Sequence, residues 1–177
     1  DSAHQQILFT TTGGIGADSC AHTNDTLTYL QPNGALNSDI YSGDSGGPVL
    51  DGEMTFNDPA SSSLISGSWR FVVMTYDQTL PSDNYKVYVD GALYGVNTKN
   101  NDSNSTEDHH CPILWGQRYG CGDGCTTIVP GTSWDGKLDD VSIWSRVLNT
   151  SEITSLYNGG SGLPVGADCP PTDPPAG

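Results

Sequence analysis

Apolar and polar residues alternate with a period of two in several short stretches of the chain, which is typical of β-strands. The strongest pattern lies at residues 69–76, where both faces carry apolar side chains, so a central strand is expected there. Residues 85–89 and 92–96 alternate around Asp90-Gly91, a dipeptide that favours a tight hairpin turn. Weaker strand patterns occur at residues 6–12, 26–30, 53–56 and 112–116.

Residues 138–144 also alternate, and they predict a strand that is packed on both of its faces. In this pattern Asp139 shares a face with Val141 and Ile143. An acidic side chain on an apolar face needs a partner, so Asp139 becomes a candidate ligand for a cation.

The period then changes to that of one short helix. Asn149 is a favourable N-cap residue, and Glu152 follows it by three positions, as in a capping box. Leu148 and Ile153 occupy the positions of a hydrophobic staple around this cap. Two glycines after Tyr157 predict the end of the helix.

Three motifs in this order resemble those of the laminin G-like and pentraxin-like domains. They are W-R-F-V-V-M-T-Y-D at residues 69–77, Y-K-V-Y-V-D-G at residues 85–91, and G-K-L-D-D-V-S-I-W-S-R with its helix at residues 136–157. The resemblance implies an all-β fold, a two-sheet antiparallel jelly-roll sandwich with one short C-terminal helix. It also implies a domain that binds sugars, proteins or calcium and catalyses no reaction.

The predicted sandwich occupies residues 1–160, and the Gly/Pro-rich residues 161–177 form an extended tail. Members of the resembled family have further strands ahead of the counterpart of residues 6–12. The N-terminal region is therefore expected either to have diverged or to lack these strands. An incomplete sandwich has an open edge, which copies of the chain or a partner segment can complete.

Composition narrows the classes of partner. The chain has 21 acidic and 6 basic residues, a formal net charge of −15, which argues against nucleic acid or an anionic membrane as a partner. No apolar stretch reaches the roughly 18 to 20 residues of a membrane span. No signal peptide opens the chain, so Asp1 is expected to be a processed or fragment terminus.

Five cysteines and several Asn-x-Ser/Thr sequons favour an oxidising, extracellular compartment. The cysteines are Cys20, Cys111, Cys121, Cys125 and Cys169, and the sequons begin at Asn24, Asn101, Asn104 and Asn149. The number of cysteines is odd, and their disulfide pairing does not follow from the sequence. Cys169, in the tail, is the candidate for a bond to another chain or back to Cys20.

No catalytic constellation has the spacing that its chemistry needs. Residues 43–48, G-D-S-G-G-P, match the nucleophile signature of chymotrypsin-like proteases, but His22 lies too near Ser45 for that fold. Jelly-roll glucanases use E-x-D-x-x-E on one strand, which none of the three glutamates forms. Asp139 and Asp140 would point to opposite faces of a strand. The sequence therefore predicts that this chain is not an enzyme.

Calcium is the stronger of two candidate metals. Hard cations prefer carboxylate and carbonyl oxygens in acidic loops, and the candidate ligands are Asp77, Asp123, Asp135 and Asp139. Ordinary turn aspartates are the alternative interpretation. Residues 109–111 and 121–125 also permit a zinc site, but disulfide bonds are favoured in a secreted chain.

Aromatic residues supply candidate sugar contacts. Trp134 and Tyr119 flank the cysteine-rich loop and are the predicted ligand-binding pair. Trp69 and Trp115 are expected in the core, and Trp144 is expected against the terminal helix.

The predicted function is that of a non-catalytic extracellular structural or adhesion module that assembles with copies of itself or with another extracellular protein. The alternative is a carbohydrate-binding, lectin-like module with or without calcium.

Overall fold

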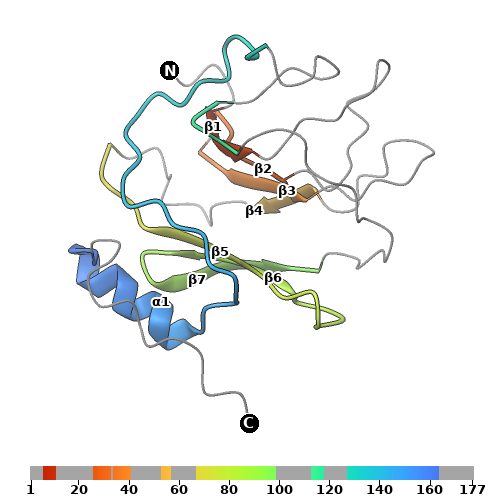
Figure 1. Cartoon of the computed structure of the whole chain (residues 1–177), viewed down its shortest axis with the longest axis vertical. Coiled ribbons are helices and arrows are strands. Elements are labelled where there is room, and N and C mark those ends of the chain that lie inside the picture. The colour runs from red at the N-terminus through yellow and green to blue at the C-terminus, as the bar shows by residue number, and fades with distance from the viewer. Residues whose placement is uncertain are drawn as a thin grey trace. The chain divides into compact units, whose positions relative to one another are not determined.

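The computed structural model describes residues 6–10, 26–32, 34–40, 53–56, 67–98, 113–117 and 127–163, with only the backbone described at 26–27, 39–40 and 53–56. These residues fall into two compact units. The first comprises residues 1–68 and 98–137, and the second comprises residues 69–97 and 138–177. Each unit contains one antiparallel sheet (Figure 1).

The first unit holds a five-stranded sheet in the order β4-β3-β2-β1-β8. Its strands are β1 (Gln6–Thr10), β2 (Thr26–Leu30), β3 (Leu36–Ile40), β4 (Glu53–Phe56) and β8 (Leu114–Trp115). Four of these lie within the stretches predicted from sequence alternation, while β3 was not predicted. Ile7 and Tyr29 form a buried apolar cluster on β1 and β2.

Strand β3 has the sequence L-N-S-D-I, in which Asn, Ser and Asp are residue types depleted in strands. The adjacent strand β2 compensates for its polar side chains. The Asn37 amide donates to the Tyr29 hydroxyl at 3.0 Å, and the hydroxyls of Ser38 and Thr28 lie 2.8 Å apart. Because these buried groups satisfy one another across the two strands, β3 forms despite its composition.

The second unit holds a three-stranded sheet in the order β5-β6-β7. Its strands are β5 (Val72–Tyr76), β6 (Tyr85–Val89) and β7 (Ala92–Asn97). The predicted hairpin joins β6 and β7, and both turn residues have positive φ, 51° at Asp90 and 78° at Gly91. This combination is the type I′ geometry that suits a two-residue hairpin.

Residues 69–76 were predicted to form a central strand, and this prediction is wrong for the described part of the sheet. The central strand is β6, and β5 lies at one side of it. Val87, Tyr88 and Val89 on β6 are all buried, whereas Val72 and Val73 on β5 are only half-buried. The apolar residues on both faces of residues 69–76 therefore predicted a strand correctly, but they did not predict its position in the sheet.

The predicted helix is α1 (Thr150–Tyr157), which lies alongside the three-stranded sheet (Figure 1). Its N-cap is Asn149, and the capping box is complete. The Asn149 side chain accepts from the Glu152 N–H at 3.0 Å, and the Glu152 carboxylate accepts from the Asn149 N–H at 2.8 Å. The staple residues Leu148 and Ile153 are both buried and share a cluster with Tyr88 of β6. This cluster holds α1 against the sheet.

After Tyr157 the helix passes into a short 3-10 turn, Asn158–Gly160. Asn158 is the C-cap in the left-handed conformation, with φ of 49°. The end predicted from the two glycines is therefore confirmed.

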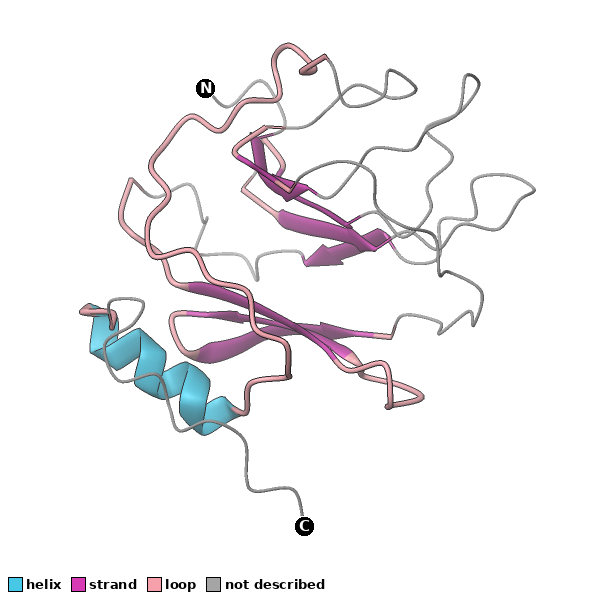
Figure 2. Ribbon diagram, in the orientation of Figure 1, coloured by secondary structure: helices cyan, strands magenta, loops and turns pink. Residues whose placement is uncertain are grey.

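The predicted strand at residues 138–144 is not formed. Figure 2 shows this segment as loop leading to α1. Asp140 has φ of +50°, and its N–H donates to the Asp139 carboxylate at 2.9 Å, a local contact that breaks the extended conformation. Val141 and Ile143 are consequently exposed rather than packed on a strand face.

Within the parts of the chain that the structure describes, no helix combines the length and apolar character needed to cross a membrane.

Candidate functional site

Strand β7 is the candidate contact region of the three-stranded sheet. Among the described strands it pairs with β6 alone, so it forms one edge of this sheet. Its sequence, A-L-Y-G-V-N, contains no charged residue and no proline. Natural edge strands usually carry such residues, because they discourage pairing with a further strand.

Two apolar side chains of β7 lie on the face of the sheet that carries Tyr88. Leu93 is opposite Tyr88 and Val96 is opposite Lys86, with a register irregularity between them. Helix α1 buries Tyr88 to 6% exposure, yet Leu93 remains 56% exposed and Val96 remains 46% exposed. The apolar cover supplied by α1 therefore does not extend to β7.

The hairpin that carries β7 is fixed at its turn by Asp90. The Asp90 N–H donates to the Phe71 carbonyl at 2.8 Å, and the Asp90 carboxylate accepts from the Phe71 N–H at 3.1 Å. The same carboxylate forms an ion pair with Arg70 at 3.0 Å. The backbone that precedes β5 is thereby tied to the turn that starts β7, so the edge strand is held in position.

The predicted calcium ligands take several different roles. The Asp77 carboxylate accepts from the Thr79 hydroxyl at 2.6 Å and from the Thr79 N–H at 3.0 Å, and these bonds lower the pKa of Asp77. The Asp139 carboxylate accepts from Asp140, and Asp135 is exposed. These contacts fit the alternative interpretation, ordinary turn aspartates, at Asp77 and Asp139.

The described residues include no group of three His, Cys, Asp or Glu side chains that could hold a metal ion. Asp77 and Asp139 belong to the second unit, whereas Asp135 belongs to the first. The calcium site therefore remains a prediction.

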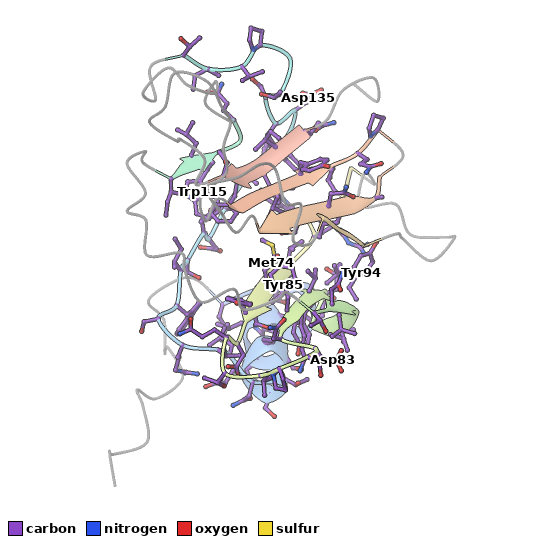
Figure 3. The ribbon with its side chains drawn as sticks, turned by 90° about the vertical axis from the view of Figure 1, so that its right-hand side faces the viewer. Met74, Asp83, Tyr85, Tyr94, Trp115 and Asp135 are labelled. Carbon is purple, nitrogen blue, oxygen red and sulfur yellow. The ribbon has the colours of Figure 1, made fainter. Side chains whose placement is uncertain are left out.

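The tryptophans differ from their predicted environments. Trp69 is 64% exposed and Trp115 is 42% exposed, so the expectation that both lie in the core is wrong. Trp69 precedes β5, and Trp115 lies on the two-residue strand β8 at the side of its sheet (Figure 3). Short, peripheral segments leave an aromatic side chain partly uncovered even when the sequence around it is apolar.

Trp144 packs against the cluster of α1, as predicted. Trp134, a predicted sugar contact, is half-buried, and its indole N–H is buried beside Gly136. A Cβ at Gly136 would lie 2.6 Å from the Trp134 Nε1 atom, so a larger residue there would force the indole to shift. The Trp134 indole N–H is therefore turned toward its own loop, and its role as a sugar contact remains a prediction.

Several predicted sites lie outside the described residues. They are the five cysteines Cys20, Cys111, Cys121, Cys125 and Cys169, the sequons at Asn24, Asn101 and Asn104, the G-D-S-G-G-P segment at 43–48, Asp123, and Tyr119. Asn149 is described and exposed. A glycan would attach to its amide nitrogen and leave the oxygen that caps α1, so the cap and the sequon are compatible.

The sequence pattern did not indicate the exposed apolar pair on β7 or the exposure of Trp115. The absence of charge in residues 92–97 was a visible signal, but only the order of the described strands places this strand at an edge. For Trp115 the sequence offered no signal, because its partner Phe9 is far away along the chain.

Comparison with known structures gives a native heptameric SAP-like pentraxin from Limulus polyphemus. Its TM-score is 0.56 at 18% identity, over 87% of this chain and 63% of the pentraxin chain. An S-layer domain-containing protein from Clostridium thermocellum matches at a TM-score of 0.37 and 20% identity, over 89% of this chain and 64% of that one. Comparison with curated proteins finds no match.

The family comparison covers most of the chain. Residues 1–154 match a laminin G family described as the concanavalin A-like lectin/glucanases superfamily. This match, the pentraxin fold and the two antiparallel sheets confirm the predicted jelly-roll sandwich class. The chain therefore belongs to the laminin G-like domains of the concanavalin A-like lectin/glucanases superfamily.

Proposed function

We propose that this chain is a non-catalytic extracellular structural or adhesion module, and that it assembles with further copies of itself through strand β7. The observation that carries the proposal is the edge position of β7 among the described strands of its sheet, together with its exposed Leu93 and Val96. An edge strand presents backbone hydrogen-bonding groups that another strand can pair with, and apolar side chains on it add buried area.

Charge favours β7 as the contact region. Copies of a chain with a net charge of −15 repel one another over most of their surface. The uncharged β7 avoids a direct like-charge contact, and physiological salt screens the remaining charges beyond about 8 Å. Self-association through β7 should therefore strengthen as the salt concentration rises, whereas an association built on ion pairs would weaken.

A non-catalytic role agrees with the way that two acidic groups are used. Glu152 accepts two hydrogen bonds from Arg146 and one from the Asn149 N–H. Asp77 is engaged by Thr79. Both carboxylates therefore accept hydrogen bonds that stabilise the local structure.

Two further considerations support the proposal. Five cysteines and four sequons are consistent with an extracellular setting. The pentraxin of similar fold is heptameric, which shows that this architecture is compatible with assembly in that protein.

A lectin-like module is the second candidate function. It is supported by the superfamily and by the exposed aromatic side chain of Trp115.

Sedimentation velocity over a wide concentration range tests assembly through β7. The informative variant combines Leu93→Lys with Val96→Lys. We expect the wild-type mass to rise with concentration and with salt, and we expect the double variant to remain a monomer because two charges now lie on the edge.

The matched control is Leu80→Lys, which adds a lysine at an exposed leucine in the loop between β5 and β6. It should assemble as the wild type does. A wild-type protein that stays monomeric at high concentration contradicts the proposal, as does a control that loses assembly to the same degree as the double variant.

A further inference from the structure

The end of α1 carries an Asn-Gly pair, Asn158-Gly159, and both of its residues are exposed. Asn158 is the C-cap of the helix, with φ of 49° and ψ of 43°, and Gly159 follows with φ of 62°. Asparagine is a thermally labile residue, and a glycine after it leaves the next amide nitrogen free to attack the side chain. Among the described residues, no atom lies within 4 Å of the position of a Cβ at Gly159, so the fold adds no obstruction there.

The hydrogen bonds that hold Asn158 in this turn are long. Its side-chain amide donates to the Gly162 carbonyl at 3.3 Å, and its own carbonyl accepts from the Ser161 N–H at 3.2 Å. The usual N–H···O distance is about 2.9–3.0 Å, so both bonds are weak. Helix ends also open more readily than helix interiors. The Asn158 side chain can therefore reach the Gly159 nitrogen without the unfolding of α1.

Two other pairs of this type within the described residues are less reactive. Asp90-Gly91 and Asp135-Gly136 carry aspartate, which is ionised at neutral pH, and a carboxylate resists attack by a nucleophile. The Asp90 carboxylate is also held by the Phe71 N–H and by Arg70. Asn158 carries a neutral amide, so it is the reactive member of this set.

We propose that Asn158 is a site of spontaneous covalent modification, and that its conversion loosens the end of α1. The Gly159 amide nitrogen loses its proton and forms a bond to the Asn158 side-chain carbonyl carbon. The bond from that carbon to the side-chain nitrogen breaks, and the nitrogen takes up a proton and leaves as ammonia. Water then opens the cyclic succinimide. Opening at the side-chain carbonyl gives aspartate, and opening at the main-chain carbonyl gives isoaspartate.

Both products disturb the end of the helix. Each adds a negative charge at the C-terminus of α1, where the helix dipole already places partial negative charge. Isoaspartate also inserts a Cβ atom into the backbone. The bonds from the Gly162 N–H to the Tyr157 carbonyl at 3.2 Å and from the Leu163 N–H to the Leu156 carbonyl at 3.1 Å then lose their register.

Tyr157 connects this turn with the three-stranded sheet. It directly precedes Asn158, and its ring centroid lies 6.1 Å from that of Phe71. The same ring lies against Gly91 in the turn between β6 and β7. A looser helix end therefore weakens the contact of α1 with the sheet. The modification does not require self-association through β7, so the two proposals can fail separately.

Peptide mapping of the aged full chain by mass spectrometry tests this site. The wild type is incubated below its unfolding midpoint at mildly alkaline pH, because the attacking nitrogen must lose its proton. We expect conversion at Asn158 at a rate that rises with pH, with isoaspartate as the larger product. Asn84 is the internal reference, since it is 2% exposed and precedes a tyrosine, and it should remain unconverted.

Three variants separate the chemistry from its effect on the fold. Gly159→Ala should slow conversion by about tenfold, which corresponds to roughly 1.4 kcal/mol of added barrier. Asn158→Asp supplies one product directly, so it should lower the thermal unfolding midpoint and speed hydrogen exchange in peptides that cover residues 150–163. Asn158→Gln keeps an amide but closes its ring slowly, so its unfolding midpoint should not fall further during ageing.

Three results would overturn the proposal. The first is an Asn158 that stays unconverted in the folded chain but converts in the urea-unfolded chain, because the turn would then protect it. The second is a Gly159→Ala variant that converts at the wild-type rate. The third is a converted wild type whose α1 amides exchange as slowly as those of the fresh protein.

Discussion

At the scale of single residues, the turn at Asp90-Gly91 determines how β7 is presented. Gly91 has φ of +78°, a conformation that costs other L-residues about 1–2 kcal/mol. Its position also brings it against the ring of Tyr157 at the end of α1, where an added Cβ would lie 3.0 Å from the Tyr157 Cδ1 atom. One glycine therefore serves both the hairpin and the approach of the helix.

We predict that Gly91→Ala lowers the free energy of unfolding by more than the backbone penalty of about 1–2 kcal/mol, because Tyr157 must also move. Urea titration measures this change. Gly159→Ala is the control, since Gly159 also has positive φ but nothing lies within 4 Å of an added Cβ. An equal decrease in the free energy of unfolding of the two variants would show that the contact with Tyr157 does not contribute to stability.

Residue types alone could not reveal some of the contacts that hold the fold. The sequence predicted the turn at Asp90-Gly91, but it did not predict that Asp90 binds Phe71 and Arg70. It also missed β3, because Asn37 and Ser38 find their partners on β2. Such pairings depend on which strands become neighbours, and the local pattern does not contain that information.

At the scale of elements, α1 is the part that the sequence predicted best. All of its signals are local, from the cap at Asn149 to the staple of Leu148 and Ile153, and they agree with one another. The sequence did not predict that Arg146 binds the capping carboxylate of Glu152 with two hydrogen bonds, at 2.9 and 2.8 Å. This ion pair connects the loop that precedes α1 with the first turn of α1.

The hydrogen bonds from Arg146, followed by the one from the Asn149 N–H, lower the pKa of Glu152. A carboxyl whose pKa is lowered on folding stabilises the folded state above its ordinary pKa of 4.5. That contribution is lost as the pH falls through the lower pKa of the folded protein.

We therefore predict that Glu152→Gln is less stable than the wild type at neutral pH, and that the difference shrinks as the pH falls below about 4.5. Urea titrations of both proteins at a series of pH values measure this change. Glu152→Gln keeps the size of the side chain, so lost packing does not account for the effect. A difference that stays constant into the acid range would contradict a role for the ionised carboxylate.

The segment at residues 138–144 shows the limit of periodicity. Its alternation predicted a strand, but the left-handed conformation of Asp140 and its bond to Asp139 give a loop. Alternation indicates which faces a strand would have, and it does not guarantee a neighbouring strand to pair with. The same limit applies to β5, which was predicted to be central.

At the scale of the whole molecule, the fold class followed from three motifs in the right order, whereas the exposed sites did not. The family match over residues 1–154 confirms the class. The exposure of Leu93 and Val96 depends on the sheet order and on how much of the sheet α1 covers, and the exposure of Trp115 depends on the position of β8 in its sheet. These are tertiary properties. The candidate sites that came from residue type alone, the aspartates and Trp134, are engaged in local turns or remain untested.

Hydrogen exchange can show whether β7 is the edge through which copies of this chain associate. Backbone amide exchange is followed by mass spectrometry in dilute and in concentrated wild-type protein. We expect peptides covering β7 to become protected as the native mass rises, while peptides covering the central strand β6 change little. A rise in mass without added protection at β7, or a chain that remains monomeric at every concentration, would contradict it.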